Sequence, residues 1–239
     1  MTDLELIKKY INEKDQEDAI KKLNHGYPVQ YIIGNVEFYN TIINVNENVL
    51  IPRFETEYLI EKTINYLNKI SINNPEILEI GTGSGCISIA LKKNINANID
   101  AIDISESAIE LAKENAKNNN TSINFKTQDI HDFNSEKKYD LIISNPPYVP
   151  YDSEVSENIK YEPQNAIYAK DDGIYFYKII LDRIHNNLKK DYLIAFEIGD
   201  KEGSEIIKII KEYLPNSYIS LEKDYNNYER YLFVSNKKL

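Results

Sequence analysis

From Pro75 onward, short apolar runs alternate with longer amphipathic stretches, and this alternation limits the folds that are open to the chain. The apolar runs predict strands, and the stretches between them predict helices. Strands separated by helices pair in parallel and are covered by helices on both faces. The predicted strands are 76–80, 99–104, 123–127, 139–144 and 192–198. The fold class is therefore predicted as α/β, with a doubly wound, mostly parallel sheet.

The end of the chain departs from that alternation. A helix is predicted over 202–213, and after it two apolar runs, 218–221 and 230–235, are separated only by a short polar segment. Two strands with no helix between them pair as an antiparallel hairpin. We expect this pair to close the sheet with an antiparallel strand.

The residues before Pro75 predict two smaller units. Residues 2–24 are charged with a sparse apolar minority, which is typical of two short amphipathic helices. β-Branched and aromatic residues dominate 30–51, which predicts a hairpin with its turn near 46–48. Pro52 ends that run, and Glu55 or Thr56 is expected to begin a helix that reaches about Lys69. The predicted division is a helical segment at 1–26, a hairpin and linking helix at 27–72, and a main domain at 73–239.

Charge and composition exclude several classes of protein. The formal net charge of −10 argues against a partner held mainly by phosphate contacts, so no direct nucleic-acid contact is expected. No apolar run is long enough to cross a bilayer, and no signal peptide is recognisable. The single cysteine cannot form an internal disulfide, which fits a reducing cytoplasm. The three histidines are scattered, and no metal site is predicted.

A glycine-rich loop follows the strand 76–80 and opens a helix. Glycines let a backbone approach a ligand closely, and a helix N-terminus offers free N–H groups. The spacing is Gly-x-Gly-x-Gly rather than the Gly-x-Gly-x-x-Gly of dinucleotide sites. An acidic residue two positions before the first glycine suits a ligand with an amino-acid end. The residues of this candidate site are Glu79, Gly81, Thr82, Gly83, Ser84 and Gly85.

The next strand carries Asp103 near its carboxyl end, where an acidic residue can bind a ribose diol. Tight strand–helix packing is the alternative explanation of the glycines. The carboxyl ends of parallel strands border one crevice, so the loop, Asp103 and the segment after strand 139–144 should meet there. Their coincidence on successive strand ends favours a binding site over packing.

That third segment is Asn145-Pro146-Pro147-Tyr148, directly after an apolar run. The two prolines fix the backbone and remove two N–H donors, so the neighbouring carbonyls remain free to accept. A rigid set of acceptors beside an aromatic ring suits a planar group with two N–H bonds. An ordinary strand-ending turn is the alternative. The long irregular stretch 149–171 that follows is expected to be a working part of the site.

Together these motifs resemble the class I S-adenosylmethionine-dependent methyltransferases, whose Rossmann-like sheet has seven strands. More narrowly, residues 27–235 resemble the protein-(glutamine-N5) methyltransferases that act on peptide chain release factors. The further matching segments are 31–34 with 38–39, 49–57, 161–163 with 172–173, 196–199, and the pair Asp224 and Arg230. Phe54 stands where the family usually has proline. The segment before Tyr31 is expected to be shorter than the family's helical N-terminal domain, which helps to hold the release factor.

The resemblance implies transfer of a methyl group from S-adenosyl-L-methionine to the side-chain amide nitrogen of a glutamine, of the Gly-Gly-Gln type, in release factors. The predicted catalytic residues are Asn145, Pro146, Pro147 and Tyr148. Asn145 Oδ1 and the Pro146 carbonyl would accept the two N–H bonds of the glutamine amide. Tyr148 would pack against the amide plane, and Pro147 would shape the wall.

The same resemblance assigns the cofactor contacts. The loop 81–85 would cradle the methionine end, with Glu79 near its ammonium group and Asn145 beside the methyl group. Asp103 would bind the ribose. Asp129 and Ile130 would border the adenine, with Ile130 standing where an aromatic residue is common.

Three other functions remain open from the sequence. A ribosomal-protein glutamine could be the target, although the Glu-Thr-Glu at 55–57 favours release factors. An N6-adenine DNA methyltransferase grips an exocyclic amine with a similar element, but it needs base flipping and a basic target-reading domain. A catalytically silent adaptor that binds the cofactor is the non-enzymatic alternative. Release factors are thus the expected partners of a cytoplasmic monomer with no membrane contact.

Four residues near these motifs receive simpler interpretations. Arg53 and Glu55 either contact the substrate loop or pair with each other. Glu197 is expected to bridge a strand and a loop. Cys86, which begins the helix after the glycine loop, is expected to be a small packing residue.

Overall fold

A seven-stranded sheet forms the centre of the molecule, for which a computed structural model describes residues 1–239. Its strand order is β10-β11-β9-β6-β3-β4-β5. The strands β5, β4, β3, β6 and β9 are parallel to one another, and β11 is antiparallel to both β9 and β10. The strand bounds are β3 (Glu76–Ile80), β4 (Asn98–Asp103), β5 (Asn124–Thr127), β6 (Tyr139–Ser144), β9 (Leu188–Glu197), β10 (Tyr218–Lys223) and β11 (Glu229–Ser235). The predicted fold class is confirmed, including the antiparallel closing strand.

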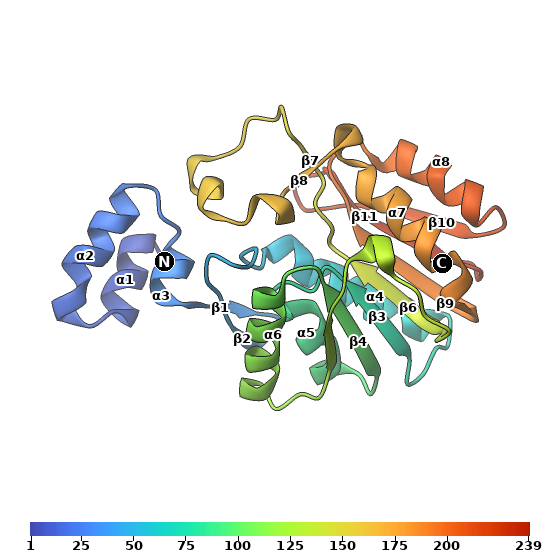
Figure 1. Cartoon of the computed structure of the whole chain (residues 1–239), viewed down its shortest axis with the longest axis horizontal. Helices are drawn as coiled ribbons and strands as arrows, with labels where there is room; N and C mark the ends of the chain where they lie inside the picture. Colours follow the sequence, from blue (N-terminus) through green and yellow to red (C-terminus); the bar gives the residue numbers. More distant parts are fainter.

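Helices cover both faces of the sheet (Figure 1). They are α4 (Phe54–Lys69), α5 (Cys86–Asn94), α6 (Glu106–Asn118), α7 (Tyr175–Ile184) and α8 (Gly203–Tyr213). Consecutive residues of a strand point to opposite faces. Ile77 packs with α4, α5 and α6 in one core, while Leu78 packs with α7 and α8 in the other, and both side chains are fully buried. Burial on both faces explains why the strands are apolar throughout rather than alternating.

The polar side chains at the N-termini of α6 and α4 differ in their hydrogen bonds. Ser105 caps α6, because its hydroxyl accepts a hydrogen bond from the Ala108 N–H at 3.2 Å. The helix α4 begins at Phe54, one residue before the earliest predicted start. Neither Glu55 nor Thr56 caps this helix, and the Thr56 hydroxyl donates instead to the carboxylate of Glu197 on β9.

The two helices predicted within residues 2–24 are confirmed, and a third helix that was not predicted follows them. The predicted pair is present as α1 (Asp3–Tyr10) and α2 (Glu13–Asn24). A third helix, α3 (Val29–Ile33), replaces the strand character predicted from residue 30 onward. The reason is tertiary: Tyr31 is buried and its hydroxyl donates to the Val49 carbonyl at 2.6 Å, while Gly34 ends the helix at φ 86°. Figure 1 shows this helical segment to one side of the sheet.

A hairpin follows, but its turn is not where the sequence analysis placed it. The strands β1 (Asn35–Phe38) and β2 (Thr41–Asn44) are joined through Tyr39 and Asn40, which have φ of 43° and 61°. A two-residue turn with both φ values positive matches the twist of paired strands. The predicted turn at 46–48 is a separate bend after the hairpin, in which Asn48 N–H donates to Asn46 Oδ1 at 2.9 Å.

The stretch 149–171 is irregular but anchored. It contains a short parallel pair, β7 (Val149–Pro150) and β8 (Tyr168–Ala169), and the 3₁₀ turns η2 (Glu157–Tyr161), η3 (Gln164–Ala166) and η4 (Asp171–Gly173). Glu162 is buried and accepts from the Ile51 N–H at 3.0 Å and from Arg53. The other 3₁₀ turns are η1 (Ile130–Asp132) and η5 (His185–Asn187). None of the helices combines the length and the apolar character that crossing a bilayer requires.

Candidate active site

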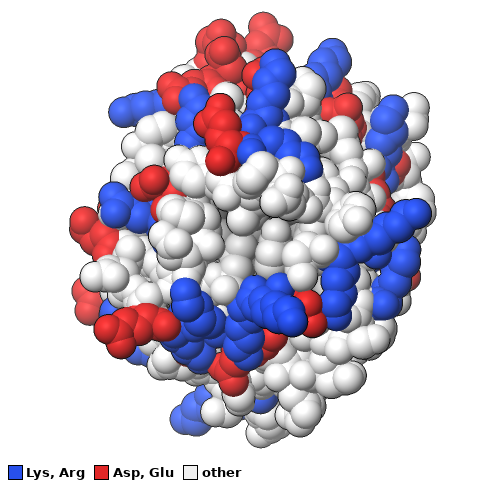
Figure 2. Space-filling view, turned by 90° about the vertical axis from the view of Figure 1, so that its right-hand side faces the viewer, with Lys and Arg blue, Asp and Glu red and all other residues white.

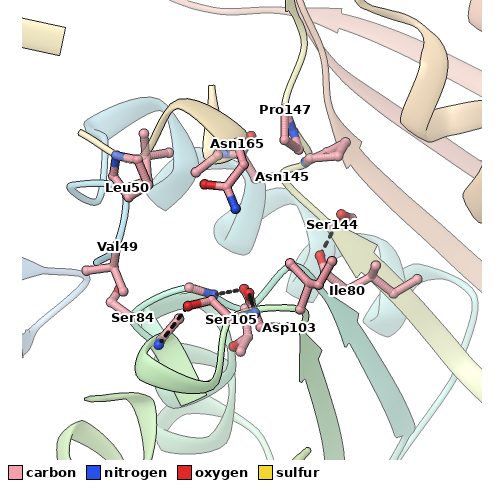
Figure 3. Close-up of a pocket in the computed structure, with 18 of the residues that line it drawn as sticks. Val49, Leu50, Ile80, Ser84, Asp103, Ser105, Ser144, Asn145, Pro147 and Asn165 are labelled. Carbon is pink, nitrogen blue, oxygen red and sulfur yellow. Dashed lines mark hydrogen bonds between the residues drawn. The ribbon is translucent and has the colours of Figure 1, made fainter. Parts of the chain in front are cut away.

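A cavity of about 440 Å³ lies at the carboxyl ends of β3, β4 and β6. In Figure 3, Val49 and Leu50 lie on one side of it, Asp103 and Ser105 form its floor, and the segment after β6 lies opposite with Asn165. The predicted site residues that line it are Gly81, Thr82, Gly83, Ser84, Asp103, Asp129, Ile130, Asn145, Pro146 and Pro147. Glu79, Gly85 and Tyr148 do not line it. Most of the predicted site is therefore brought together at one crevice.

The three loop glycines have two different functions. Gly81 and Gly83 have φ of 73° and 53°, and a Cβ added to either would meet no atom within 4 Å, so the backbone is open toward the cavity. At Gly85 an added Cβ would lie 3.1 Å from the Cβ of Ala112 on α6. Gly85 thus permits close packing of α5 against α6, whereas Gly81 and Gly83 leave room for a ligand.

Glu79 supports the loop from beneath. Its Oε2 accepts from the Thr82 hydroxyl at 2.8 Å, from the Ser88 N–H at 3.1 Å and from the Ser88 hydroxyl. Its Oε1 is buried and has no hydrogen-bond partner. Burial is the main cause that raises the pKa of Glu79 to about 7. From this position Glu79 braces the loop without lining the cavity, and its contact with an ammonium group stays a prediction.

Asp103 ties the loop to the end of β4. Its Oδ2 accepts from the Gly83 N–H at 2.8 Å, and its Oδ1 accepts from the Ser105 N–H at 2.9 Å. Burial is the main cause that raises its pKa, against the effect of these backbone hydrogen bonds. One carboxylate therefore fixes the shape of the glycine loop and borders the cavity, where a ribose diol is predicted to bind.

At the far end of the floor, Asp129 and Ile130 meet a residue that the sequence analysis missed. His131 also lines the cavity, and its backbone N–H and Nδ1 lie 2.9 and 2.6 Å from Asp129 Oδ1. The His131 Nε2 is 2.9 Å from the Tyr175 hydroxyl on α7. Burial opposes ionisation of Asp129, but the hydrogen bonds from His131 outweigh it and lower the pKa of Asp129. The sequence does contain a signal for His131, because it stands only two residues after Asp129, just beyond the end of a predicted strand.

Asn145 is held by a series of hydrogen bonds that runs from the cavity lining, which includes Thr56, to the buried Glu197. Its Nδ2 donates to the Thr56 hydroxyl oxygen at 3.2 Å, and that hydroxyl donates to Glu197 Oε2 at 2.7 Å. The Asn145 Oδ1 and the Pro146 carbonyl accept no hydrogen bond from the protein. Two unpaired acceptors on consecutive residues thus stand at the wall of the cavity.

Tyr148 turns away from that wall. Its hydroxyl lies 3.4 Å from Glu197 Oε1, and its ring lies 5.6 Å from the guanidinium carbon of Arg230. Burial, followed by the charge of Glu197, raises the pKa of Tyr148 far above its ordinary value. The predicted packing of Tyr148 against a substrate amide does not match this position. Glu197 bridges the strand and the loop as predicted, with its pKa raised to about 7, mainly by burial.

The remaining charged candidates find partners within the protein. Arg53 lines the cavity and pairs with Glu162 at 2.5 Å, so the alternative in which Arg53 and Glu55 pair with each other is wrong. Contact of either residue with a substrate loop stays a prediction. Asp224 and Arg230 are paired, with 3.5 Å between Oδ2 and Nε. Cys86 is buried, and burial raises the pKa of its thiol to about 12, which fits the predicted packing role.

Comparison with known proteins identifies the family. A family model described as the methyltransferase small domain matches residues 58–162. The release factor glutamine methyltransferase of Streptococcus pneumoniae is 41% identical over 222 residues, which span 91% of this chain and 78% of that protein. Its counterpart in Flavobacterium psychrophilum is 39% identical over 92% of this chain and 79% of that protein.

A solved structure agrees at the level of the fold. The release factor-specific protein-(glutamine-N5) methyltransferase of Alicyclobacillus acidocaldarius superimposes with a TM-score of 0.51 and 22% identity, over 81% of this chain and 99% of that one. Identity near 40% along most of both chains is a stronger finding than a shared fold, because many functions occupy this fold. The resemblance predicted from the motifs is confirmed. The chain belongs to the release factor glutamine methyltransferase family.

Proposed function

We propose that this chain transfers the methyl group of S-adenosylmethionine to the side-chain amide nitrogen of a glutamine in a peptide chain release factor. The names of the relatives at 41% and 39% identity support that substrate. The observation that carries the chemistry is the pair of free acceptors at the cavity wall, Asn145 Oδ1 and the Pro146 carbonyl. A primary amide has two N–H bonds, which these two acceptors match in number.

The acceptors address the difficulty of the reaction. An amide nitrogen is a weak nucleophile because its lone pair is conjugated with the carbonyl group. Acceptors on both N–H bonds would hold the nitrogen in place and favour the positive charge that builds on it during attack. Pro146 and Pro147 keep this part of the wall rigid, so the acceptors are placed before the substrate arrives. Neither acceptor is a strong base, and the proton leaves to water after the transfer.

The opposite side of the cavity fits S-adenosylmethionine. The backbone at Gly81 and Gly83 is open toward the cavity, and a volume of about 440 Å³ is in the range of small-molecule sites. The loop 81–84 would hold the methionine end, Asp103 the ribose, and Asp129 with Ile130 the adenine. When bound, S-adenosylmethionine supplies a methyl group on a positively charged sulfur. Asn145 would contact both this methyl group and the glutamine amide.

The exocyclic amine of adenine in DNA also carries two N–H bonds, so the two acceptors alone do not distinguish DNA from a protein glutamine. The charge of the protein does distinguish them. The formal net charge of −10 disfavours a phosphate-bound partner. On the end of the molecule that carries α8 and β10, Figure 2 shows Lys and Arg side chains interspersed with Asp and Glu around an uncharged centre. This end of the molecule therefore offers no continuous basic surface. We propose that the enzyme acts as a cytoplasmic monomer on protein substrates only.

The direct test is mass spectrometry of a purified release factor after incubation with the enzyme and S-adenosylmethionine carrying a labelled methyl group. We expect one labelled methyl group on the glutamine side chain of the Gly-Gly-Gln sequence, and about a hundredfold slower labelling when Asn145→Ala replaces the wild-type enzyme. Parallel incubations contain duplex DNA and ribosomal protein. Label in either of these, with none in the release factor, would refute the proposal.

A further inference from the structure

We propose that Thr56 and Glu197 are positioning residues that decide which end of the Asn145 side-chain amide faces the cavity, an inference that rests on the proposed function. Neither residue touches the substrate in this scheme. They act through Asn145, whose Oδ1 must face the glutamine amide if it is to accept an N–H bond. The structure joins the three by hydrogen bonds of 3.2 and 2.7 Å.

Asparagine needs such a device because its two ends are alike in shape. The oxygen and the NH₂ group of an amide differ by hydrogen atoms only, so packing alone does not distinguish the two orientations. An amide turned by 180° would present donors to the donors of the substrate. In that orientation the wall would repel the group it has to hold.

The donor-to-acceptor direction of these hydrogen bonds is set by the buried residue Glu197. Glu197 is 1% exposed, and above its raised pKa of about 7 its carboxylate only accepts hydrogen bonds, as it does here from the Thr56 and Tyr148 hydroxyls. Thr56 is also buried, and its hydroxyl hydrogen is therefore directed to Glu197 Oε2. What Thr56 then offers to Asn145 is a lone pair, which pairs with Nδ2 and leaves Oδ1 toward the cavity. One fixed acceptor thus sets the orientation of two successive side chains.

The three hydrogen-bonded residues come from three separate elements, so their relative positions are fixed by the packing of the fold. Thr56 lies in the first turn of α4, Asn145 follows β6, and Glu197 ends β9. The residue before α4, Arg53, is paired with Glu162, so the start of this helix is held from a second side. A shift of α4 would therefore break the hydrogen bond to Asn145 and also move Arg53, which lines the cavity.

The test compares two substitutions at position 56. Thr56→Ser keeps the hydroxyl, and Thr56→Val keeps the shape but removes it. We expect Thr56→Ser to retain kcat within about threefold, and Thr56→Val to lower kcat by at least about tenfold. The KM for the release factor and the Kd for S-adenosylmethionine should stay near the wild-type values in both. The matched control is Thr63→Val, since Thr63 is another buried threonine of α4, whose hydroxyl donates to the Leu59 carbonyl of the same helix.

All rates are measured well below the lowest melting temperature of the set. A wild-type kcat in Thr56→Val would overturn the positioning role, as would equal losses in the serine and valine variants. A weakened Kd for S-adenosylmethionine that accounts for the lost rate would also overturn it, because the damage would then be general. These outcomes concern active wild-type enzyme, whereas a wild-type enzyme that leaves the release factor unlabelled refutes the proposed function itself.

Discussion

The two sides of the cavity are built in different ways. On the glycine side, the loop 81–85 is shaped by contacts with near neighbours: Asp103 binds the Gly83 N–H, and Glu79 binds Thr82. On the acceptor side, Asn145 depends on Thr56, which is 89 residues away, and Thr56 depends on Glu197, which is 141 residues away. A locally built side can bind its ligand alone. The acceptor side works only when distant elements are docked against one another.

This difference predicts that substitutions on the two sides change different quantities. The glycine side should govern the affinity for S-adenosylmethionine, and the acceptor side should govern the rate of transfer. Substitutions on each side can test whether cofactor affinity and transfer rate change independently.

Asn145→Ala should have the largest effect. Removing one acceptor for the glutamine amide is expected to cost about 3 kcal/mol in the transition state, which is about a hundredfold in kcat. The Kd for S-adenosylmethionine, measured by calorimetry, should change far less than the rate. A variant with undiminished turnover would remove Asn145 from the mechanism. Equal losses in affinity and rate would show that the two sides are not separable.

Gly83→Ala should affect the other side. The backbone at this position has φ of 53°, which costs a non-glycine residue roughly 1–2 kcal/mol. We expect about a tenfold weaker Kd for S-adenosylmethionine, with kcat at saturation closer to the wild-type value. Gly34→Ala is the matched control, since Gly34 has φ of 86°, has open space around it and lies outside the cavity. It should lower the melting temperature and leave the Kd unchanged.

Asp103→Ala should weaken cofactor binding severalfold without changing the target residue. The reason is double, because Asp103 borders the cavity and also accepts from the Gly83 and Ser105 N–H groups. Asp103→Asn keeps one acceptor of the same shape and should lose less affinity. Calorimetry that gives the wild-type Kd for the alanine variant would contradict this role.

The same difference explains what could be predicted from the sequence. The sheet, the glycine loop, Asp103 and the Asn-Pro-Pro-Tyr segment were predicted because apolar periodicity, glycines and prolines act over a few residues. Tyr148 was misplaced and the role of Thr56 was missed, because both positions depend on contacts with Glu197 across the fold. The helix α3 was missed for a similar reason, since the burial of Tyr31 overrides its strand propensity.

Each side of the cavity also contains one buried carboxyl group with its pKa raised to about 7, mainly by burial: Glu79 and Glu197. They differ in their partners, because both oxygens of Glu197 are hydrogen-bonded, whereas Glu79 Oε1 has none. An unpartnered buried oxygen is a cost to folding that a small ligand or a water could relieve. Glu79 should therefore be the clearer source of pH-dependent stability.

Glu79→Gln should have the smallest effect on activity and a measurable effect on stability. A folded pKa near 7, above the unfolded value, means that the folded state binds the proton more tightly. The stabilisation from protonated Glu79 is complete below the unfolded pKa and is lost as the pH rises to about 7. Relative to the wild type, Glu79→Gln should gain about 2–3 kcal/mol of unfolding free energy between pH 5 and pH 8.

Denaturant unfolding of the ligand-free proteins at both pH values measures this gain. Glu136→Gln is the matched control for the same chemical change, because Glu136 is an exposed carboxylate far from the glycine loop in the sequence. If the stability of Glu79→Gln follows that of the wild type at both pH values, Glu79 is ionised at little cost in the folded state. The glycine side would then be no more strained than the acceptor side, and the orphaned oxygen would have to be solvated.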